Sequence, residues 1–253
     1  MTKLRSMMSG FLMLAVAVGA SPVFAAPIEF TVNPSAIGAP QSAFQATIAD
    51  FSYTATVNQT GPVGCVPGCP FTETGHGSFS GFKGADFITP VLNTGLNQNP
   101  GYTLTAEFTA AGTAVPEGSG IRADFSSFNL TLTAHPTSGG NITVAQSTNL
   151  VAGQAHIFGP ELARGDFHVV VGLNPVGGFL SGPFTLGLNT ADFAGNNTNV
   201  SGFAVGPSTG TIQGSGNLSV TPGSVSAVPE PASLVLLGSG MAALGWWRRR
   251  STR

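Results

Sequence analysis

Apolar and polar residues alternate with a two-residue period in several separate runs, and no other feature constrains the fold of this chain as strongly. In the run 128–133, apolar side chains occupy every second position, with Asn or Thr between them. The run 102–109 alternates similarly, and 44–57 does so with a break near Ala49 and Asp50. Successive side chains of a strand point to opposite faces, so these runs predict β-strands.

Turn-forming residues separate these runs. Gly, Pro and Asn gather at 99–101, 138–141 and 174–178, where they favour turns. Only 8% of the residues are charged, so long exposed helices would lack the Lys, Arg and Glu that usually build them. No stretch shows a convincing 3.6-residue period. The sequence therefore predicts an all-β domain over 26–219, with an antiparallel β-sandwich or barrel-like fold.

Phenylalanine supplies most of the aromatic side chains, with 18 residues spread along the chain. We interpret them as core residues between two sheets, because platforms for sugar rings more often use Trp and Tyr. Both tryptophans lie near the C-terminus, outside these alternating runs. Tyr53 and Tyr102 are therefore the better candidates for exposed aromatic side chains.

The N-terminus has the three parts of a secretory signal peptide. Lys3 and Arg5 are basic, 11–18 is apolar, and a small-x-small pattern ends at Ala25. Cleavage between Ala25 and Ala26 is favoured, because a cut after Ala26 would place Pro27 directly after the cleaved bond. We expect the first 25 residues to direct export through the Sec machinery and to be removed by signal peptidase.

The two cysteines, Cys65 and Cys69, flank a strong turn signal, Pro67-Gly68. In the oxidising compartment that an exported chain reaches, a disulfide closing this tight loop is the favoured interpretation. Because the loop is short, its entropic stabilisation should be modest. A metal or redox role stays open, with His76 not far along the chain, although metal sites need more ligands than two sulfurs.

The expected mature chain is acidic. Between 26 and 231 it has three basic residues, Lys83, Arg122 and Arg164, against 11 acidic ones, which gives a net charge of −8. Phosphate contacts need a basic surface, so nucleic-acid binding is poorly supported. An acidic, sparsely charged exported chain fits a polysaccharide-rich environment, or one with divalent cations between acidic polymers, and composition alone shows neither.

No catalytic pattern is recognisable in the sequence. Its four histidines form no His-x-x-x-His arrangement, and 75–79 nearly mimics a Gly-x-Ser-x-Gly elbow but lacks the last glycine. Paired carboxylates for glycoside hydrolysis stay open, since such pairs meet only in space. We expect no enzyme, no catalytic residue, no metal site and no cofactor. A calcium site is the alternative to the expected absence of metals and cofactors. Its oxygen ligands would come from one Gly- and Asn-rich stretch, and the candidates are Asp192, Asn196, Asn197 and Asn199.

The last 26 residues, 228–253, form a three-part segment that follows a short linker of flexible composition at 220–227. Its prolines restrict φ and keep the first part extended. The run 234–247 is largely apolar and predicts a short transmembrane helix, with aromatic residues suited to a bilayer interface and arginines that stay in the cytoplasm. The residues that carry these roles are Pro229, Glu230, Pro231, Trp246, Trp247, Arg248, Arg249 and Arg250.

The order and spacing of these parts resemble the PEP-CTERM sorting signal of Gram-negative bacteria. The resemblance implies that the tail holds the exported protein in the inner membrane until an exosortase processes it near Pro229-Glu230-Pro231. These residues would then be recognition residues for another enzyme. A plain C-terminal membrane anchor is the alternative, although such anchors usually have about 20 apolar residues.

The body of the chain resembles the flocculation-associated PEP-CTERM proteins in four segments, 30–37, 101–104, 150–159 and 214–217. This resemblance implies a transiently anchored protein that moves to the outer surface or extracellular matrix. There it would promote flocculation or biofilm formation together with exopolysaccharide. The alternatives are a glycan-binding module with a defined polysaccharide ligand and a surface hydrolase.

Overall fold

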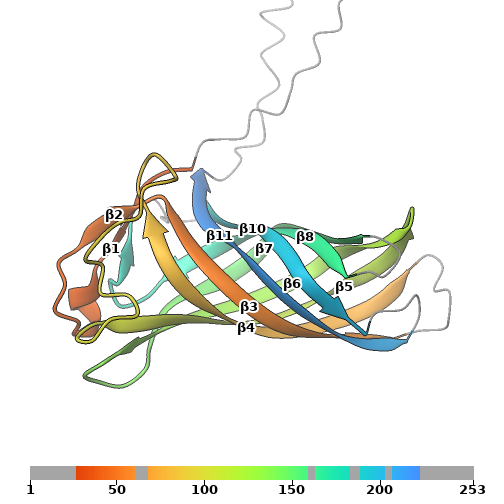
Figure 1. Ribbon diagram of the computed structural model, residues 1–253, viewed down its shortest axis with the longest axis horizontal. Helices are drawn as coiled ribbons and strands as arrows, with labels where there is room; N and C mark the ends of the chain where they lie inside the picture. Colours follow the sequence, from red (N-terminus) through yellow and green to blue (C-terminus); the bar gives the residue numbers. More distant parts are fainter. Residues whose placement is uncertain (1–26, 61–67, 159–162, 183–188, 203–206, 223–253) are drawn as a thin grey trace, which may run out of the picture.

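The chain forms a closed antiparallel β-barrel with a small sheet at one end (Figure 1). The computed structural model describes residues 27–60, 68–158, 163–182, 189–202 and 207–222. The barrel strands follow one another in the order β10-β11-β3-β4-β5-β6-β7-β8, so the all-β prediction is confirmed in its barrel form. Their bounds are Ile48–Gln59 (β3), Cys69–Lys83 (β4), Tyr102–Glu117 (β5), Gly120–Pro136 (β6), Ile142–Phe158 (β7), Arg164–Pro175 (β8), Asn189–Ser201 (β10) and Ser208–Pro222 (β11).

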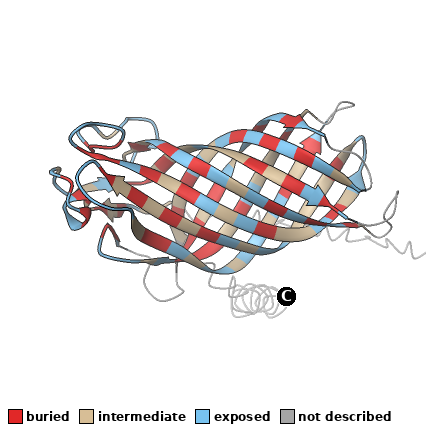
Figure 2. Cartoon of the chain, turned by 90° about the horizontal axis from the view of Figure 1, so that it is seen from below, coloured by how far each residue is buried: buried red, intermediate tan, exposed pale blue. Residues whose placement is uncertain are grey.

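Burial alternates along the barrel strands, as the bands of colour in Figure 2 show. In β4, for example, Phe71 and Phe79 are buried, whereas Thr72 and Thr74 are exposed. Apolar side chains therefore fill the interior, and hydroxyl-bearing side chains cover much of the outer wall. The break in the sequence alternation near Asp50 coincides with a shift of register between β3 and β4 directly after that residue.

Glycines on the inner wall make room for aromatic rings. A Cβ atom at Gly75 would lie 2.3 Å from Cζ of Phe108. A Cβ atom at Gly214 would lie 2.6 Å from a ring carbon of Tyr53. The rings occupy the space that a larger residue would need, so the close packing inside the barrel depends on small residues in its wall.

The small sheet covers one end of the barrel and shares its core. It has the order β2-β1-β9, and a short 3-10 helix, η1, follows β1. Phe30, Val32 and Phe179 are buried in one cluster with Tyr102, and the rings of Phe179 and Tyr102 meet edge to face at 5.3 Å. We call this the capped end. The bounds are Phe30–Val32 (β1), Pro34–Ile37 (η1), Phe44–Ala46 (β2) and Leu180–Ser181 (β9).

The described chain enters and leaves the barrel at the capped end. The backbone N–H of Ile28 donates to the carbonyl oxygen of Val220 at 2.9 Å. The last strand continues to Pro222 and so includes the first residues of the predicted linker. The signal peptide with its cleavage site at Ala25 and Ala26, the rest of the linker and the 228–253 segment lie outside the described residues. Among the described residues, no helix has the length and apolarity needed to cross a membrane.

The structure corrects two expectations about aromatic residues. Tyr102 is 0% exposed and Tyr53 lines the barrel interior, so the expectation of exposed tyrosines was wrong. The phenylalanines do form a core, but inside a barrel instead of between two sheets. Phe87, in the loop after β4, and Phe158, the last residue of β7, are exceptions at 39% and 49% exposed.

Candidate functional site

A shallow groove crosses the outer wall of the barrel over β3, β4, β5 and β6. Its volume is about 560 Å³. A neighbouring groove of about 290 Å³ continues over β11 and shares Thr54 and His76 with it. We call the two together the outer groove. The polar side chains that line its larger part are Thr54, Thr56, Thr74, His76, Glu107, Thr109, Asn129 and Thr131.

Strand register arranges these side chains in two rows across the wall. Adjacent strands lie about 4.8 Å apart, so each row is a regular ladder of polar groups. One row runs from Thr56 through Thr74 and Thr109 to Asn129. The other runs from Gln213 through Thr54, His76 and Glu107 to Thr131.

The polar side chains of the larger groove do not hydrogen-bond with one another in the described part of the chain. Elsewhere on the outer wall such pairs do form. Ser201 and Thr211 hydroxyls lie 2.8 Å apart, and the Thr209 hydroxyl donates to Oδ1 of Asn58 at 2.9 Å. The hydroxyls on the Thr56 row therefore keep their donors and acceptors for solvent or for a ligand.

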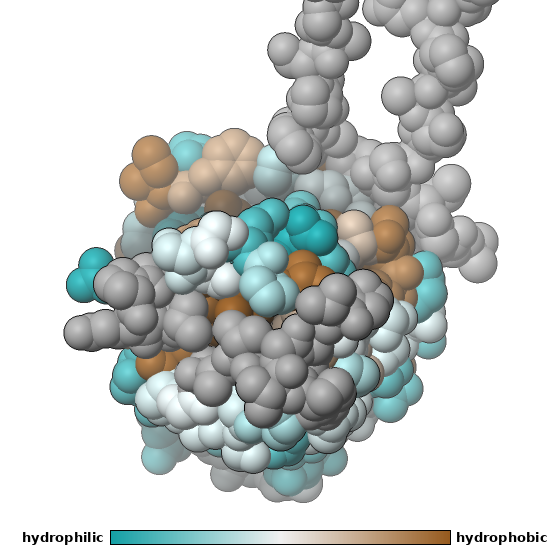
Figure 3. Space-filling model, turned by 90° about the vertical axis from the view of Figure 1, so that its right-hand side faces the viewer, coloured by the Kyte–Doolittle hydropathy of each residue, from teal (hydrophilic) through white to brown (hydrophobic). Residues whose placement is uncertain are grey.

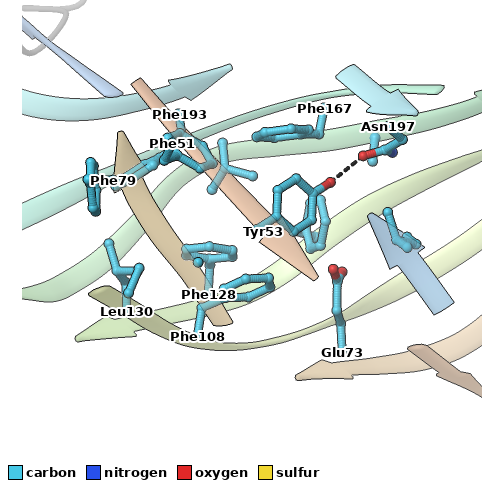
Figure 4. Close-up of a pocket in the computed structure, with 16 residues that line it drawn as sticks. Phe51, Tyr53, Glu73, Phe79, Phe108, Phe128, Leu130, Phe167, Phe193 and Asn197 are labelled. Atoms are coloured by element: carbon cyan, nitrogen blue, oxygen red, sulfur yellow. Dashed lines mark hydrogen bonds between the residues drawn. The ribbon is translucent and has the colours of Figure 1, made fainter. Parts of the chain in front are cut away.

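The second candidate site is a cavity inside the barrel, shown in Figure 4. It has a volume of about 60 Å³ and is lined mainly by aromatic and aliphatic side chains. Tyr53 packs edge to face against Phe167, with ring centroids 5.2 Å apart, and Phe108 stacks on Phe128 at 5.4 Å. The Tyr53 hydroxyl donates to Oδ1 of Asn197, which lies on β10, two strands away around the barrel. The cavity is thus an aromatic chamber with one internal polar contact.

Glu73 is the charged residue of this chamber. Its carboxyl group points into the cavity in Figure 4, and the residue is only 7% exposed. Burial away from water disfavours the ionised form and raises the pKa of Glu73 to about 7. Burial, together with the nearby Glu73 charge, also raises the pKa of Tyr53 far above its ordinary value. Tyr53 therefore remains a neutral hydrogen-bond donor.

Sequence reasoning missed Glu73, although a signal for it exists. Glu73 follows Phe71 by two residues and precedes Phe79 by six, so all three share the inner face of β4. A charged residue in phase with core phenylalanines is unusual, because buried carboxylates are costly unless they are paired.

The structure disperses the calcium candidates along β10. Asn197 faces inward toward Tyr53, whereas Asn196 and Asn199 are exposed on the outer wall. Asp192 lies 2.9 Å from Nε2 of His168. The alternation of the strand therefore separates these oxygens, and the described residues contain no group of three or more His, Cys, Asp or Glu side chains arranged to hold a metal ion.

The remaining histidines and cysteines have separate environments. Nδ1 of His156 lies 2.9 Å from the Asp166 carboxylate, and Nε2 of His135 lies 2.7 Å from the Thr105 hydroxyl. Cys69, the first residue of β4, is disulfide-bonded. Cys65 lies outside the described residues, so its pairing with Cys69 stays a prediction.

Comparison with known proteins bears on the C-terminal segment. Residues 227–250 match the family model of the PEP-CTERM protein-sorting motif. The chain carries a PEP-CTERM sorting signal. The predicted recognition residues Pro229, Glu230 and Pro231 fall within the match, as do the tryptophans and arginines at 246–250. No curated protein and no solved structure matches the chain.

The PEP-CTERM motif implies exosortase-dependent export and anchoring in a membrane before processing. It begins shortly after Pro222, the last residue of β11. The barrel is therefore the part of the chain that the sorting signal delivers, and the outer groove and the inner chamber are the candidates for its activity.

Proposed function

We propose that this PEP-CTERM protein is a non-enzymatic surface or matrix component that promotes flocculation or biofilm formation by binding exopolysaccharide. The observation that carries the proposal is the outer groove, with its two rows of polar side chains on an exported barrel. Hydroxyl and amide groups at regular spacing match the hydrogen-bonding groups of a sugar chain. After exosortase processing, the barrel would reside at the outer surface or in the matrix.

The chemistry of the groove supports adhesion more than hydrolysis. Glu107 is the carboxylate among the described groove residues, and hydrolysis of a glycosidic bond generally uses two. Thr74 and Thr109 face each other across β4 and β5, so a polysaccharide strand could contact both hydroxyls. Many weak contacts of this kind give a protein affinity for long polymers through multivalency.

A glycan-binding module with one defined ligand is the second candidate. His76 and Glu107 are register partners in the middle of the groove, and such a pair offers selective hydrogen bonds within a row of less selective hydroxyls. This candidate predicts saturable binding to one purified polysaccharide and little binding to others. Broad binding to several polysaccharides favours the adhesive matrix component.

The groove variant Thr74→Val with Thr109→Val tests the proposal, because it removes two hydroxyls and retains the β-branched shape. Two hydrogen bonds of roughly 0.7 kcal/mol each correspond to about a tenfold loss of affinity for host exopolysaccharide. Aggregates of cells that carry this variant should disperse, as we also expect after deletion of the gene, while polysaccharide secretion continues.

The matched control is Thr72→Val with Thr103→Val, which changes two exposed threonines of the same strands outside the groove. Sedimentation of the cells and binding of labelled polysaccharide to the purified protein would be measured for both variants. Equal losses in the two variants would count against the groove. Loss of polysaccharide secretion after gene deletion would count against an adhesive role.

Processing is tested separately by intact mass. We expect a species that ends near Pro229-Glu230-Pro231 in the matrix of the normal strain, and a longer species in the membrane of a strain without exosortase. A full-length C-terminus in both strains would reduce the tail to a plain anchor and remove the main support for the matrix location.

A further inference from the structure

The inner chamber has features of a binding site that the proposed adhesive function does not use. Its larger cavity of about 60 Å³ adjoins a second cavity of about 30 Å³, and Glu73, Phe125 and Asn197 line both. Glu73 lies four residues into β4, away from the capped end. Figure 3 looks onto that opposite end, where hydrophobic surface shows between hydrophilic described residues.

Within the described part of the chain, the buried carboxyl group of Glu73 has no hydrogen-bond partner. Among the described residues, no side chain or backbone group donates a hydrogen bond to it, and no cation lines either cavity. A candidate donor on the neighbouring strand β3, the Tyr53 hydroxyl, is directed to Oδ1 of Asn197. A buried carboxylate in this state is costly, and a ligand that supplied a positive donor would remove that cost.

The rest of the chamber favours an alkyl group. The rings of Phe51, Phe108, Phe128, Phe167 and Phe193 line the larger cavity. Their faces attract cations as well as apolar groups. An anion would be repelled by Glu73, and an uncharged hydrocarbon would leave the carboxyl group unpaired. The small volume excludes bulky ring systems.

We propose that the barrel interior binds a small primary alkylammonium ion, with its ammonium group on the Glu73 carboxylate and its alkyl chain among the phenylalanine rings. An ammonium group carries three donors and one positive charge, which match the unpartnered carboxylate. The alkyl chain replaces water in the aromatic part of the cavity. Binding inside the barrel leaves the outer groove free, so this activity is independent of polysaccharide binding.

Calorimetric titration of the purified full chain with n-butylammonium tests the proposal, with n-butanol as the uncharged control. We expect one saturable site for n-butylammonium and weaker binding of n-butanol. Glu73 and Tyr53 are the titratable residues that line the two cavities in the described chain, and Tyr53 stays neutral. Affinity for the cation should therefore rise about tenfold from pH 6 to pH 8 as Glu73 ionises, whereas n-butanol should not show this rise.

The variant Glu73→Gln should lower the affinity for n-butylammonium at least tenfold, and Glu29→Gln, an exposed residue directly before β1, should leave it unchanged. If Glu73→Gln does not fold, the wild-type chain still decides the question through carbon-13 NMR of its glutamate carboxyl groups. A bound cation should lower the pKa of Glu73. Absence of saturable binding, equal affinity for n-butanol, or an unchanged Glu73 titration with saturating ligand would overturn the proposal and leave water as the occupant.

Discussion

At the scale of single residues, Glu73 links the interior of the barrel to pH. Its pKa is raised from an ordinary value near 4.5 to about 7 in the folded chain. The folded state therefore binds one more proton than the unfolded state between these values. Stability contributed by the protonated carboxyl is present below about pH 4.5 and is lost as the pH rises through about 7.

The barrel should consequently lose stability on the order of 3 kcal/mol between pH 4.5 and pH 8 through this residue. The variant Glu73→Gln should flatten that part of the curve, because glutamine does not titrate. Urea unfolding at a series of pH values measures the difference. Parallel curves for the variant and the wild type would show that Glu73 titrates normally in the fold.

A second residue pair acts in the same direction on the outside of the barrel. Asp192 accepts a hydrogen bond from His168 and raises the pKa of that histidine. Stability from this pair is present at acidic pH and is lost as the pH rises through the raised pKa. His168 is half-exposed, so its share is small compared with that of Glu73.

At the scale of a strand, β4 shows how glycine and aromatic positions depend on each other. Gly75→Ala places a methyl group 2.3 Å from Phe108, which must then move from its stacked position on Phe128. We expect a loss of about 1–3 kcal/mol in the free energy of unfolding, as is typical of overpacked cores. Denaturant titration of the variant measures this loss.

Gly81→Ala is the matched control on the same strand, because a Cβ atom there would meet no atom within 4 Å. It should be neutral or slightly stabilising, since alanine restricts the unfolded chain more than glycine does. If both variants lose the same stability, the effect belongs to strand propensity and not to the ring beneath Gly75.

The strands also show what the sequence could predict. Period-two alternation marked three regions that form strands, 44–57, 102–109 and 128–133, because it follows directly from strand geometry. It did not choose between sandwich and barrel, since both place alternate residues inward. The outer groove was harder to predict from the sequence. Its residues come from four strands, and only the strand register makes them neighbours; one row consists of Thr56, Thr74, Thr109 and Asn129. The prediction that Tyr53 and Tyr102 are exposed was wrong, because composition does not tell which face of a strand a residue occupies.

At the scale of the whole molecule, the sorting signal follows a strand that ends at the capped end. We therefore expect the anchored protein to turn its capped end toward the membrane and the opposite end outward. Fluorophores on Ala36→Cys in η1 and Ser119→Cys between β5 and β6 can test this orientation in a strain without exosortase. A quencher attached to lipid should dim the first label more than the second, and equal quenching would contradict the expectation.

The position of β11 has a mechanical consequence. This strand pairs along its length with β10 on one side and β3 on the other, and it is the last strand before the sorting segment. Tension applied along β11 from its C-terminal side would load both rows of interstrand hydrogen bonds in shear, so that many must yield together. A barrel held through such a strand is suited to resist a pull transmitted from its C-terminal side.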